Sequence, residues 1–189
     1  MVKVFQLYEI LACAGFLTLF HLDTEHLTIR ELCLDDAEFI LLLLNEPSFI
    51  RFIGDKGVRT LDDAQQYIRT GPLASYEKNG FGLYLVQLKS DETPIGMCGL
   101  LKRETLADVD IGFAFLPAFW NKGYAFESAS AIMVYAKNVL KLPRIVAITD
   151  KDNDPSAKLL EKIGLRFDRI ITLSPNEELK LFISEELNK

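Results

Sequence analysis

One stretch near the middle of the chain combines an apolar strand pattern, a glycine turn and a helix start. VDIGFAFL at 109 to 116 has the composition of a buried strand, PAFWNKGYA at 117 to 125 contains Gly123, and FESASAIMVYA follows at once. The N-terminus of a helix offers backbone N–H groups without partners in the helix, which suits an anionic ligand such as phosphate. Taken alone, Gly123 is more simply explained by a steric function, in which glycine only allows the chain to turn. The stretch therefore predicts strand, turn and helix in that order and leaves both interpretations of the glycine open.

The rest of the chain alternates between strand and helix patterns. Strands are expected at 27–32, 81–88, 94–101, 109–116, 144–149, 167–173 and 178–184, where apolar residues alternate or run together. Helices are expected from Asp35, with Glu38 as its reciprocal partner, to a stop at Pro47, from Thr60 to Gly71-Pro72, over 124–139, and from a cap at Asp154 to Gly164. This order predicts an α/β (α+β) fold with one mixed sheet, an antiparallel meander within it, and helices on both faces.

Length and charge limit the kinds of protein that this chain can be. With 189 residues, of which 49% are hydrophobic, it is long enough for one sizeable core, and no linker or repeat divides it. The net charge of −6 argues against a broad contact with nucleic acid. Cys13, Cys33 and Cys98 form no CxxC pair, and His21 and His26 are the only histidines, so we expect no metal site, no disulfide framework and a reducing cytoplasm.

The first residues form an apolar N-terminal extension, 1–21. Glu9 interrupts it, and the uninterrupted part from Ile10 to Phe20 is shorter than the roughly 20 residues needed to cross a bilayer. We therefore expect no membrane anchor. An extra strand, a dimer contact and an extension produced by start-site choice are all compatible with this composition.

Two motifs connect the chain to a known family. Residues 120–125, WNKGYA, occupy the pyrophosphate motif Gln/Arg-x-x-Gly-x-Gly/Ala, with Trp120 in place of Gln or Arg. NDPSAKLLEKIGL at 153–165 is similar to the second motif, Asn-x-x-Ser followed by a leucine-rich helix and Lys-x-Gly-Phe, with Leu165 in place of phenylalanine. The chain thus resembles the GNAT superfamily of acyl-coenzyme A-dependent N-acyltransferases, in its branch of ribosomal-protein N-terminal acetyltransferases. The resemblance covers roughly residues 22 to 185 and implies a single GNAT domain at 22–189, with a mostly antiparallel central sheet of about seven strands.

The resemblance implies acetyl-CoA as the acyl-donor cosubstrate and assigns residues to it. In the turn these residues are Trp120, Asn121, Lys122, Gly123, Tyr124 and Ala125, and the backbone N–H groups of 121–125 would bind the pyrophosphate at the positive end of the helix. Lys122 would add charge, unless it is only a solvated loop lysine, and the Trp120 ring is interpreted as a core anchor beside the turn. The backbone of Phe113, Phe115 and Leu116 would pair with the pantetheine arm, which Asn153 and Ser156 would also contact.

Acyl transfer from a thioester to an amine needs a deprotonated amine and a proton for the departing thiolate. Asp110 is the candidate base, because the family often places its base at the start of the strand that leads into the turn. The alternative for Asp110 is a strand-end aspartate that faces solvent. Many relatives donate the proton from a tyrosine at the position of Leu160, so Ser156 is the remaining candidate donor, unless it only caps the helix that follows. A thiol pKa of about 8.5 also allows the thiolate to leave without an acid.

The acceptor is expected beside two polar loops, 48–60 and 173–178, with Arg51, Phe52 and Arg59 as lining residues. The acidic balance of the chain mildly favours a cationic acceptor, which could be a protein N-terminus or a small amine such as a polyamine or an aminoglycoside. Two other functions are considered. One is a non-catalytic acyl-CoA-binding module of the same fold, and the other is a nucleotide-binding protein, which is disfavoured because neither GxxxxGK[ST] nor GxGxxG occurs. We expect a monomer or a homodimer whose partners are a coenzyme A thioester and an amine, with no nucleic acid, membrane or metal.

Overall fold

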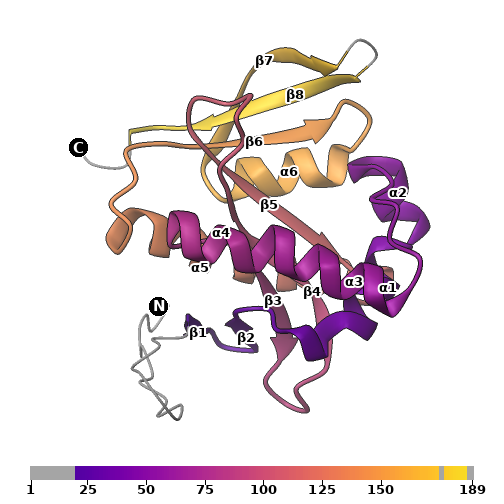
Figure 1. The fold of residues 1–189 in the computed structure, drawn as a ribbon. Coiled ribbons are helices and arrows are strands. Elements are labelled where there is room, and N and C mark those ends of the chain that lie inside the picture. The colour runs from indigo at the N-terminus through magenta and orange to yellow at the C-terminus, as the bar shows by residue number, and fades with distance from the viewer. Residues whose placement is uncertain (1–19, 175–176, 187–189) are drawn as a thin grey trace.

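The computed structural model describes residues 20–174 and 177–186 (Figure 1). Its strands are β1 His21–Asp23, β2 Leu27–Arg30, β3 Leu83–Leu88, β4 Pro94–Leu101, β5 Val109–Phe115, β6 Ile145–Asp150, β7 Leu165–Ser174 and β8 Glu177–Ser184. Its α-helices are α1 Ala37–Leu44, α2 Pro47–Ile53, α3 Leu61–Ile68, α4 Ala74–Asn79, α5 Tyr124–Asn138 and α6 Asp154–Lys162. Nearly all of the apolar extension at 1–21 lies outside the described residues, so its interpretations stay predictions.

The described strands form one open sheet of eight strands, in the order β1-β2-β3-β4-β5-β6-β8-β7. Every neighbouring pair is antiparallel except β5 and β6, which run parallel. The mixed, mostly antiparallel sheet is thus confirmed. It has one strand more than the seven expected, because β1 turns back onto β2 through a short turn in which Thr24 hydrogen bonds to Leu27.

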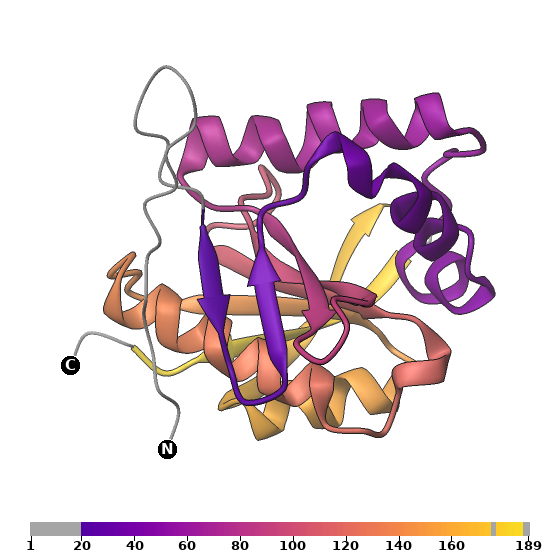
Figure 2. The same ribbon diagram turned by 90° about the horizontal axis from the view of Figure 1, so that it is seen from below.

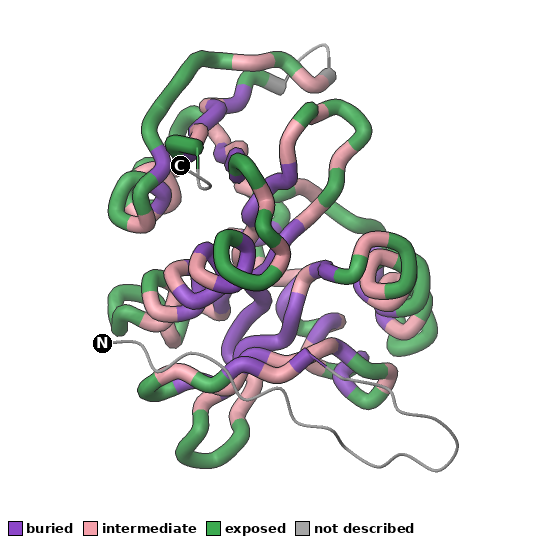
Figure 3. Tube along the Cα trace, turned by 90° about the vertical axis from the view of Figure 1, so that its left-hand side faces the viewer, coloured by how far each residue is buried: buried purple, intermediate pink, exposed green. Residues whose placement is uncertain are grey.

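Helices cover both faces of the sheet, as expected. In Figure 2 the helices α1 to α4 lie above the sheet, and α5 and α6 lie below it. One buried cluster packs α1, α2 and α3 against one face of β3 and β4, at Leu85 and Met97. The other cluster packs α5 and α6 against the opposite face, where Val86 and Ile111 point. Figure 3 shows these buried segments between the exposed outer turns of the helices.

Two prolines do not end helices where the sequence predicted an end. α1 ends at Leu44, and Pro47 instead begins α2, where its missing N–H costs nothing because the first N–H groups of a helix have no partner. The expected polar loop at 48–60 is therefore helical as far as Ile53. Likewise, Gly71-Pro72 lies inside a π turn, Arg69–Leu73, that carries α3 into α4. The wider turn accommodates Pro72, whose nitrogen carries no hydrogen for the helical ladder.

The helix caps follow the sequence only in part. The Thr60 hydroxyl accepts from the Asp63 N–H, and this predicted helix start is confirmed. At the first helix the carboxylate that accepts from the backbone is that of Asp36, rather than those of Asp35 or Glu38, and Arg30 holds it at 2.8 Å. In α6 the cap is Asn153 and not Asp154: the Asn153 Oδ1 accepts from the Ser156 N–H at 3.1 Å.

Candidate active site

The parallel strands β5 and β6 separate soon after they begin. Their described pairing is limited to Val109 with Ile145 and Asp110 with Val146, and the strands then diverge toward the right of Figure 1, where α2 lies. Neighbouring parallel strands end at the same edge of a sheet, which is where ligands bind in many α/β proteins. The glycine turn follows β5, and the loop with Asn153 follows β6. The two sequence motifs are therefore brought together at the open end of a V-shaped gap.

The backbone of β5 faces this gap at alternate residues. The Leu116 N–H donates to the Ile95 carbonyl at 3.0 Å, on the β4 side. Hydrogen-bonded positions alternate along an antiparallel pair, so Phe113 and Phe115 direct their backbone groups away from β4 and into the gap. This is the orientation that their predicted contact with the pantetheine arm requires. The contact predicted for Leu116 is not available, because its N–H is used by Ile95 and its carbonyl accepts from the Phe119 N–H at 2.9 Å.

The Trp120 side chain lies at the surface beside the end of β5. Its indole Nε1 donates to the Phe115 carbonyl at 2.7 Å, while 45% of the residue stays exposed. The predicted core position of the ring is therefore wrong. The hydrogen bond ties the turn to the strand and occupies one of the carbonyl groups that point into the gap.

The glycine turn presents a row of backbone N–H groups. Asn121 and Gly123 have φ angles of 59° and 89°, and Gly123 is the N-cap of α5. Because glycine has no side chain to cap the helix, no described residue accepts a hydrogen bond from the N–H groups of 121–126. A Cβ on Gly123 would meet no atom within 4 Å, so the space in front of the helix is open. Unpaired N–H groups at the positive end of a helix, facing open space, fit a phosphate group.

A second polar link holds the first turn of α5. The Glu127 carboxylate accepts from the Thr24 hydroxyl at 2.5 Å and from the His26 N–H at 2.7 Å, and it lies 2.9 Å from His26 Nδ1. The hydrogen bond to Glu127 and its charge raise the pKa of His26. Burial acts to raise the pKa of Glu127, but the bonds from Thr24 and His26 lower it overall. No local sequence pattern connects residues about a hundred positions apart, so this link could not be predicted from the sequence.

The residues at the start of α6 lie across the gap from the glycine turn. Asn153 uses its Oδ1 for the helix cap, and its amide nitrogen makes no hydrogen bond to a described residue. Ser156 contributes its backbone N–H to that cap, but its hydroxyl has no described partner, so the alternative in which its side chain only caps the helix is wrong. Leu160, at the position where many relatives have tyrosine, is 1% exposed and belongs to the core.

Asp110 lies at the closed end of the gap. It is 1% exposed, so the alternative of a solvent-facing aspartate is wrong. Its Oδ2 accepts from Arg103 Nε at 2.5 Å, and its buried Oδ1 makes no hydrogen bond to a described residue. Burial raises the pKa of Asp110 to about 6. The charge and the hydrogen bond of Arg103 oppose this rise, and so does the nearby backbone N–H of Ile148. Such a carboxylate is ionised at neutral pH and is still basic enough to accept a proton.

The predicted acceptor residues lie on and after α2, which contacts β6. On this helix the Arg51 guanidinium lies 4.8 Å from the centre of the Phe52 ring. Arg59 is held within its own loop, with Nη2 at 2.5 Å from Asp55 Oδ2 and Nη1 at 3.1 Å from Asn45 Oδ1. The helix that carries Arg51 and Phe52 thus contacts the strand on one side of the gap, and the bonds of Arg59 fix the chain that follows this helix.

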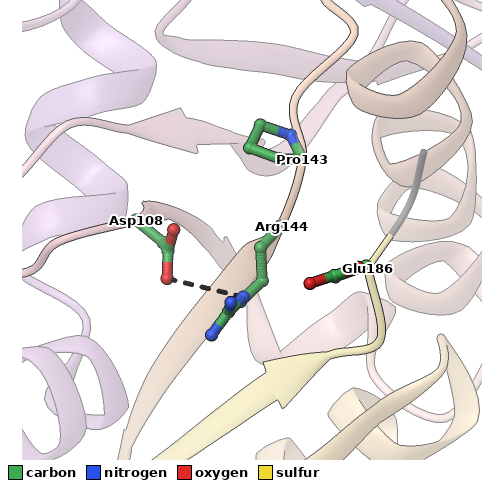
Figure 4. Close-up of a pocket in the computed structure, with 4 residues that line it drawn as sticks. All are labelled: Asp108, Pro143, Arg144 and Glu186. Atoms are coloured by element: carbon green, nitrogen blue, oxygen red, sulfur yellow. Dashed lines mark ion pairs between the residues drawn. The ribbon is translucent and has the colours of Figure 1, made fainter. Parts of the chain in front are cut away.

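Two recesses lie away from the gap. The one in Figure 4, of about 130 Å³, is at the start of β5 and β6, where Asp108 Oδ2 lies 3.9 Å from Arg144 Nε. Pro143 and Glu186 complete its lining. A more open recess of about 480 Å³ lies between α6, β7 and β8. Neither recess contains a predicted site residue.

Within residues 20–174 and 177–186, no group of three or more His, Cys, Asp and Glu side chains is arranged to hold a metal ion. In the same ranges, no helix has the length and apolar character required to cross a membrane.

Comparisons with known proteins agree on one family. A family model described as an acetyltransferase (GNAT) domain matches residues 26–166. The uncharacterized N-acetyltransferase YnaD of Bacillus subtilis (strain 168) is 31% identical over 146 residues, which cover 77% of this chain and 82% of YnaD.

Solved structures show the same fold. An acetyltransferase (GNAT family) from Bacillus anthracis is 26% identical, with a TM-score of 0.72 over 87% of this chain and 96% of that one. RimL, a ribosomal L7/L12 alpha-N-protein acetyltransferase solved in complex with coenzyme A, has a TM-score of 0.77 over 88% of this chain and 97% of its own. At 12% identity, RimL shares the fold alone. From the family model and the sequence relatives, the chain belongs to the GNAT acetyltransferase family and is an N-acetyltransferase.

Proposed function

We propose that the chain transfers the acetyl group of acetyl-CoA to a primary amine, and that the amine attacks the thioester carbonyl directly. The observation that carries this proposal is the row of unpaired N–H groups at 121–126, which opens beside the gap between β5 and β6. A diphosphate needs several converging donors, and the arm that leads from it to the thioester needs a channel. One strand and the turn that follows it would supply both.

Acetyl-CoA supplies the acetyl group on a thiolate leaving group. The N–H groups of 121–125 would hold its diphosphate, and Lys122, whose Nζ lies 5.3 Å from the centre of the Phe119 ring, would add positive charge at the edge of the site. The backbone of Phe113 and the N–H of Phe115 would bind the pantetheine arm in the way that a strand binds a neighbouring strand, while the Phe115 carbonyl stays bonded to Trp120. The free amide nitrogen of Asn153 would donate to that arm from the opposite side.

Proton transfer is assigned to Asp110 and Ser156. An α-amine with a pKa of about 8 is mostly protonated at neutral pH, so a base near the acceptor raises the fraction that can react. Asp110 would take this proton on Oδ1, directly or through a water molecule, because Oδ2 is held by Arg103. The Ser156 hydroxyl would donate a proton to the departing thiolate and would at once take one back from water, because an alkoxide is far more basic than a thiolate.

The acceptor would enter from the side of α2, past Arg51 and Phe52. Protein N-termini and small amines are both included in the proposal. RimL, which shares the fold, is named for an α-amine of a ribosomal protein, and this supports the first class. A cytoplasmic location is also part of the proposal, in keeping with the free thiols of Cys33 and Cys98.

The test is release of free thiol from acetyl-CoA in the presence of a panel of amines: peptides with a free N-terminus, a polyamine and free lysine. Each peptide has a matched control with a blocked N-terminus. We expect release that depends on the acceptor, and we expect the Asp110→Asn variant to lose most of it while still binding coenzyme A. Tight coenzyme A binding without thiol release from any amine would instead favour the non-catalytic module.

A further inference from the structure

We propose that Arg103 is a positioning residue for Asp110. It fixes one carboxylate oxygen, leaves the other to accept a proton, and sets the pH range in which the carboxylate is ionised. The inference rests on the proposed function of Asp110 as the base. Arg103 lies in the connection between β4 and β5, seven residues before Asp110, and no sequence motif singles it out.

The contact between the two residues is asymmetric. Arg103 Nε donates to Oδ2 at 2.5 Å, and the Arg103 side chain is 39% exposed whereas that of Asp110 is 1% exposed. The other oxygen, Oδ1, is buried without a described partner. Leaving a buried carboxylate oxygen unpaired costs free energy, and most such atoms in proteins are paired. One oxygen is therefore fixed in place, and the other is left for a proton that arrives from the acceptor.

The other groups around Asp110 leave Arg103 as the cation that acts on it. Asp110 is on the face of β5 that packs against α1 to α3, the face to which Ala114 belongs. From α3, Tyr67 lies within range of the Arg103 charge: burial raises the pKa of the Tyr67 phenol, and Arg103 opposes that rise. From β6, the Ile148 N–H acts on the carboxylate in the same direction as Arg103.

Two other charged residues of the β4–β5 connection have partners of their own, and a third, Glu104, is exposed to solvent. Asp108 Oδ2 lies 3.9 Å from Arg144 Nε. Lys102 Nζ donates to the Ala107 carbonyl at 2.7 Å. Lys102 is therefore a matched control: it carries the same charge as its neighbour Arg103, but it is bonded elsewhere.

The physical consequence of losing Arg103 follows from the two opposing effects on Asp110. Burial disfavours the charged carboxylate, and a nearby positive charge lowers a carboxyl pKa by roughly 1–3 units. Without Arg103 only the Ile148 N–H would oppose burial, so the pKa of Asp110 would rise from about 6 toward or above neutrality. A much larger fraction of Asp110 would then be protonated at neutral pH than in the wild type.

The experiment measures kcat/KM for the amine as a function of pH in four proteins: the wild type, Arg103→Gln, Arg103→Lys and Lys102→Gln. On a logarithmic plot the wild type should rise with a slope of about 2 below the pKa of Asp110 and about 1 between that pKa and the pKa of the amine, because both groups must lose a proton. Arg103→Gln should move the lower break upward by about one unit or more. Arg103→Lys and Lys102→Gln should leave it within a few tenths of a unit of the wild type. The titration of the amine is common to all four proteins and cancels in the comparison.

Two further measurements separate the possible failures. Asp110→Asn should abolish the lower break, and coenzyme A affinity with circular dichroism should show that each variant is folded. If Asp110→Asn loses the break but Arg103→Gln keeps it at the wild-type pH, Asp110 is the base and Arg103 does not position it. If Asp110→Asn retains the break, the base has been assigned wrongly and the inference on Arg103 falls with it. If Arg103→Gln does not fold, the result for Arg103→Lys decides: a break displaced by a full unit, despite the retained charge, would contradict control by charge.

Discussion

Gly123 offers the sharpest test of the donor site, because a matched glycine exists elsewhere in the chain. Gly123 has φ +89° and Gly164 has φ +93°, and at both positions a Cβ would meet no atom within 4 Å. A side chain at either position therefore causes the same backbone strain and no collision. The two glycines differ in what lies in front of them: the N–H row of α5 in one case, and the end of α6 in the other.

The expected magnitudes follow from these positions. A non-glycine residue in the left-handed region costs roughly 1–2 kcal/mol, which lowers the Tm of a chain of this length by about 2–8 °C. Gly123→Glu and Gly164→Glu should lose similar stability. Only Gly123→Glu also places a carboxylate at the proposed diphosphate site, and two unit charges about 5 Å apart near a protein surface repel by about 3 kcal/mol. Coenzyme A affinity should therefore fall by about a hundredfold in Gly123→Glu alone.

Calorimetric titration with coenzyme A measures this difference, and thermal unfolding measures the shared strain. The loss in Gly123→Glu should shrink in 0.5 M salt, since the repulsion is partly exposed to solvent and is screened over about 4 Å at that ionic strength. Gly123→Ala separates strain from charge and should bind more tightly than Gly123→Glu. Equal coenzyme A affinities in the two glutamate variants would show that the diphosphate does not bind at this turn.

Three further outcomes are expected. Because Glu127 raises the pKa of His26, the ion pair between them stabilises the fold fully below about pH 6.5, and this contribution is lost as the pH rises through the folded-state pKa. The difference in urea midpoint between the wild type and His26→Gln should therefore narrow from pH 6 to pH 9. A constant difference would exclude a charged link to Glu127. Trp120→Phe should cost more free energy of coenzyme A binding than free energy of unfolding, because it removes the donor to the Phe115 carbonyl from a ring that is nearly half exposed. An unchanged coenzyme A affinity would show that this hydrogen bond does not shape the site. Asn153→Ala should lower stability by about 1 kcal/mol through the lost cap of α6, measured by chemical unfolding, and a neutral effect would contradict that cap.

The fold was predictable where the signal lies within a few neighbouring residues. The alternating apolar residues of β3, β4 and β5 need no distant partner to be recognised, and Thr60 with Asp63 makes a cap from four consecutive positions. The helix ends predicted at Pro47 and Pro72 were wrong for the same reason. A proline stops a helix, begins one or lies in a widened turn according to what packs around it, and that packing is tertiary.

The candidate site divides in the same way. Gly123 and its N–H row were predictable, since a strand, a turn and a helix start are contiguous in sequence. The predicted core position of Trp120 was wrong because an indole can fill an apolar pocket or donate a hydrogen bond at the surface, and its residue type does not distinguish the two. Its acceptor is a backbone carbonyl, which has no signature in the sequence. Arg103 could not be found, because its partner is defined by how the β4–β5 connection folds back onto the sheet.

The register of β5 would explain how the proposed donor channel and the proposed base can lie on the same strand. With a period of two, β5 turns its odd-numbered backbone groups into the gap and the side chain of Asp110 toward α3, so a slip of one residue would exchange both. Close contacts around β4 oppose such a slip. Gly99 faces Gly112 across the β4–β5 pair, a Cβ on Gly99 would collide with the Gly82 carbonyl, and a Cβ on Gly96 would collide with the end of β5. The packing of β4, a strand that contributes no proposed site residue, therefore helps to fix the register of the strand that carries the proposed base.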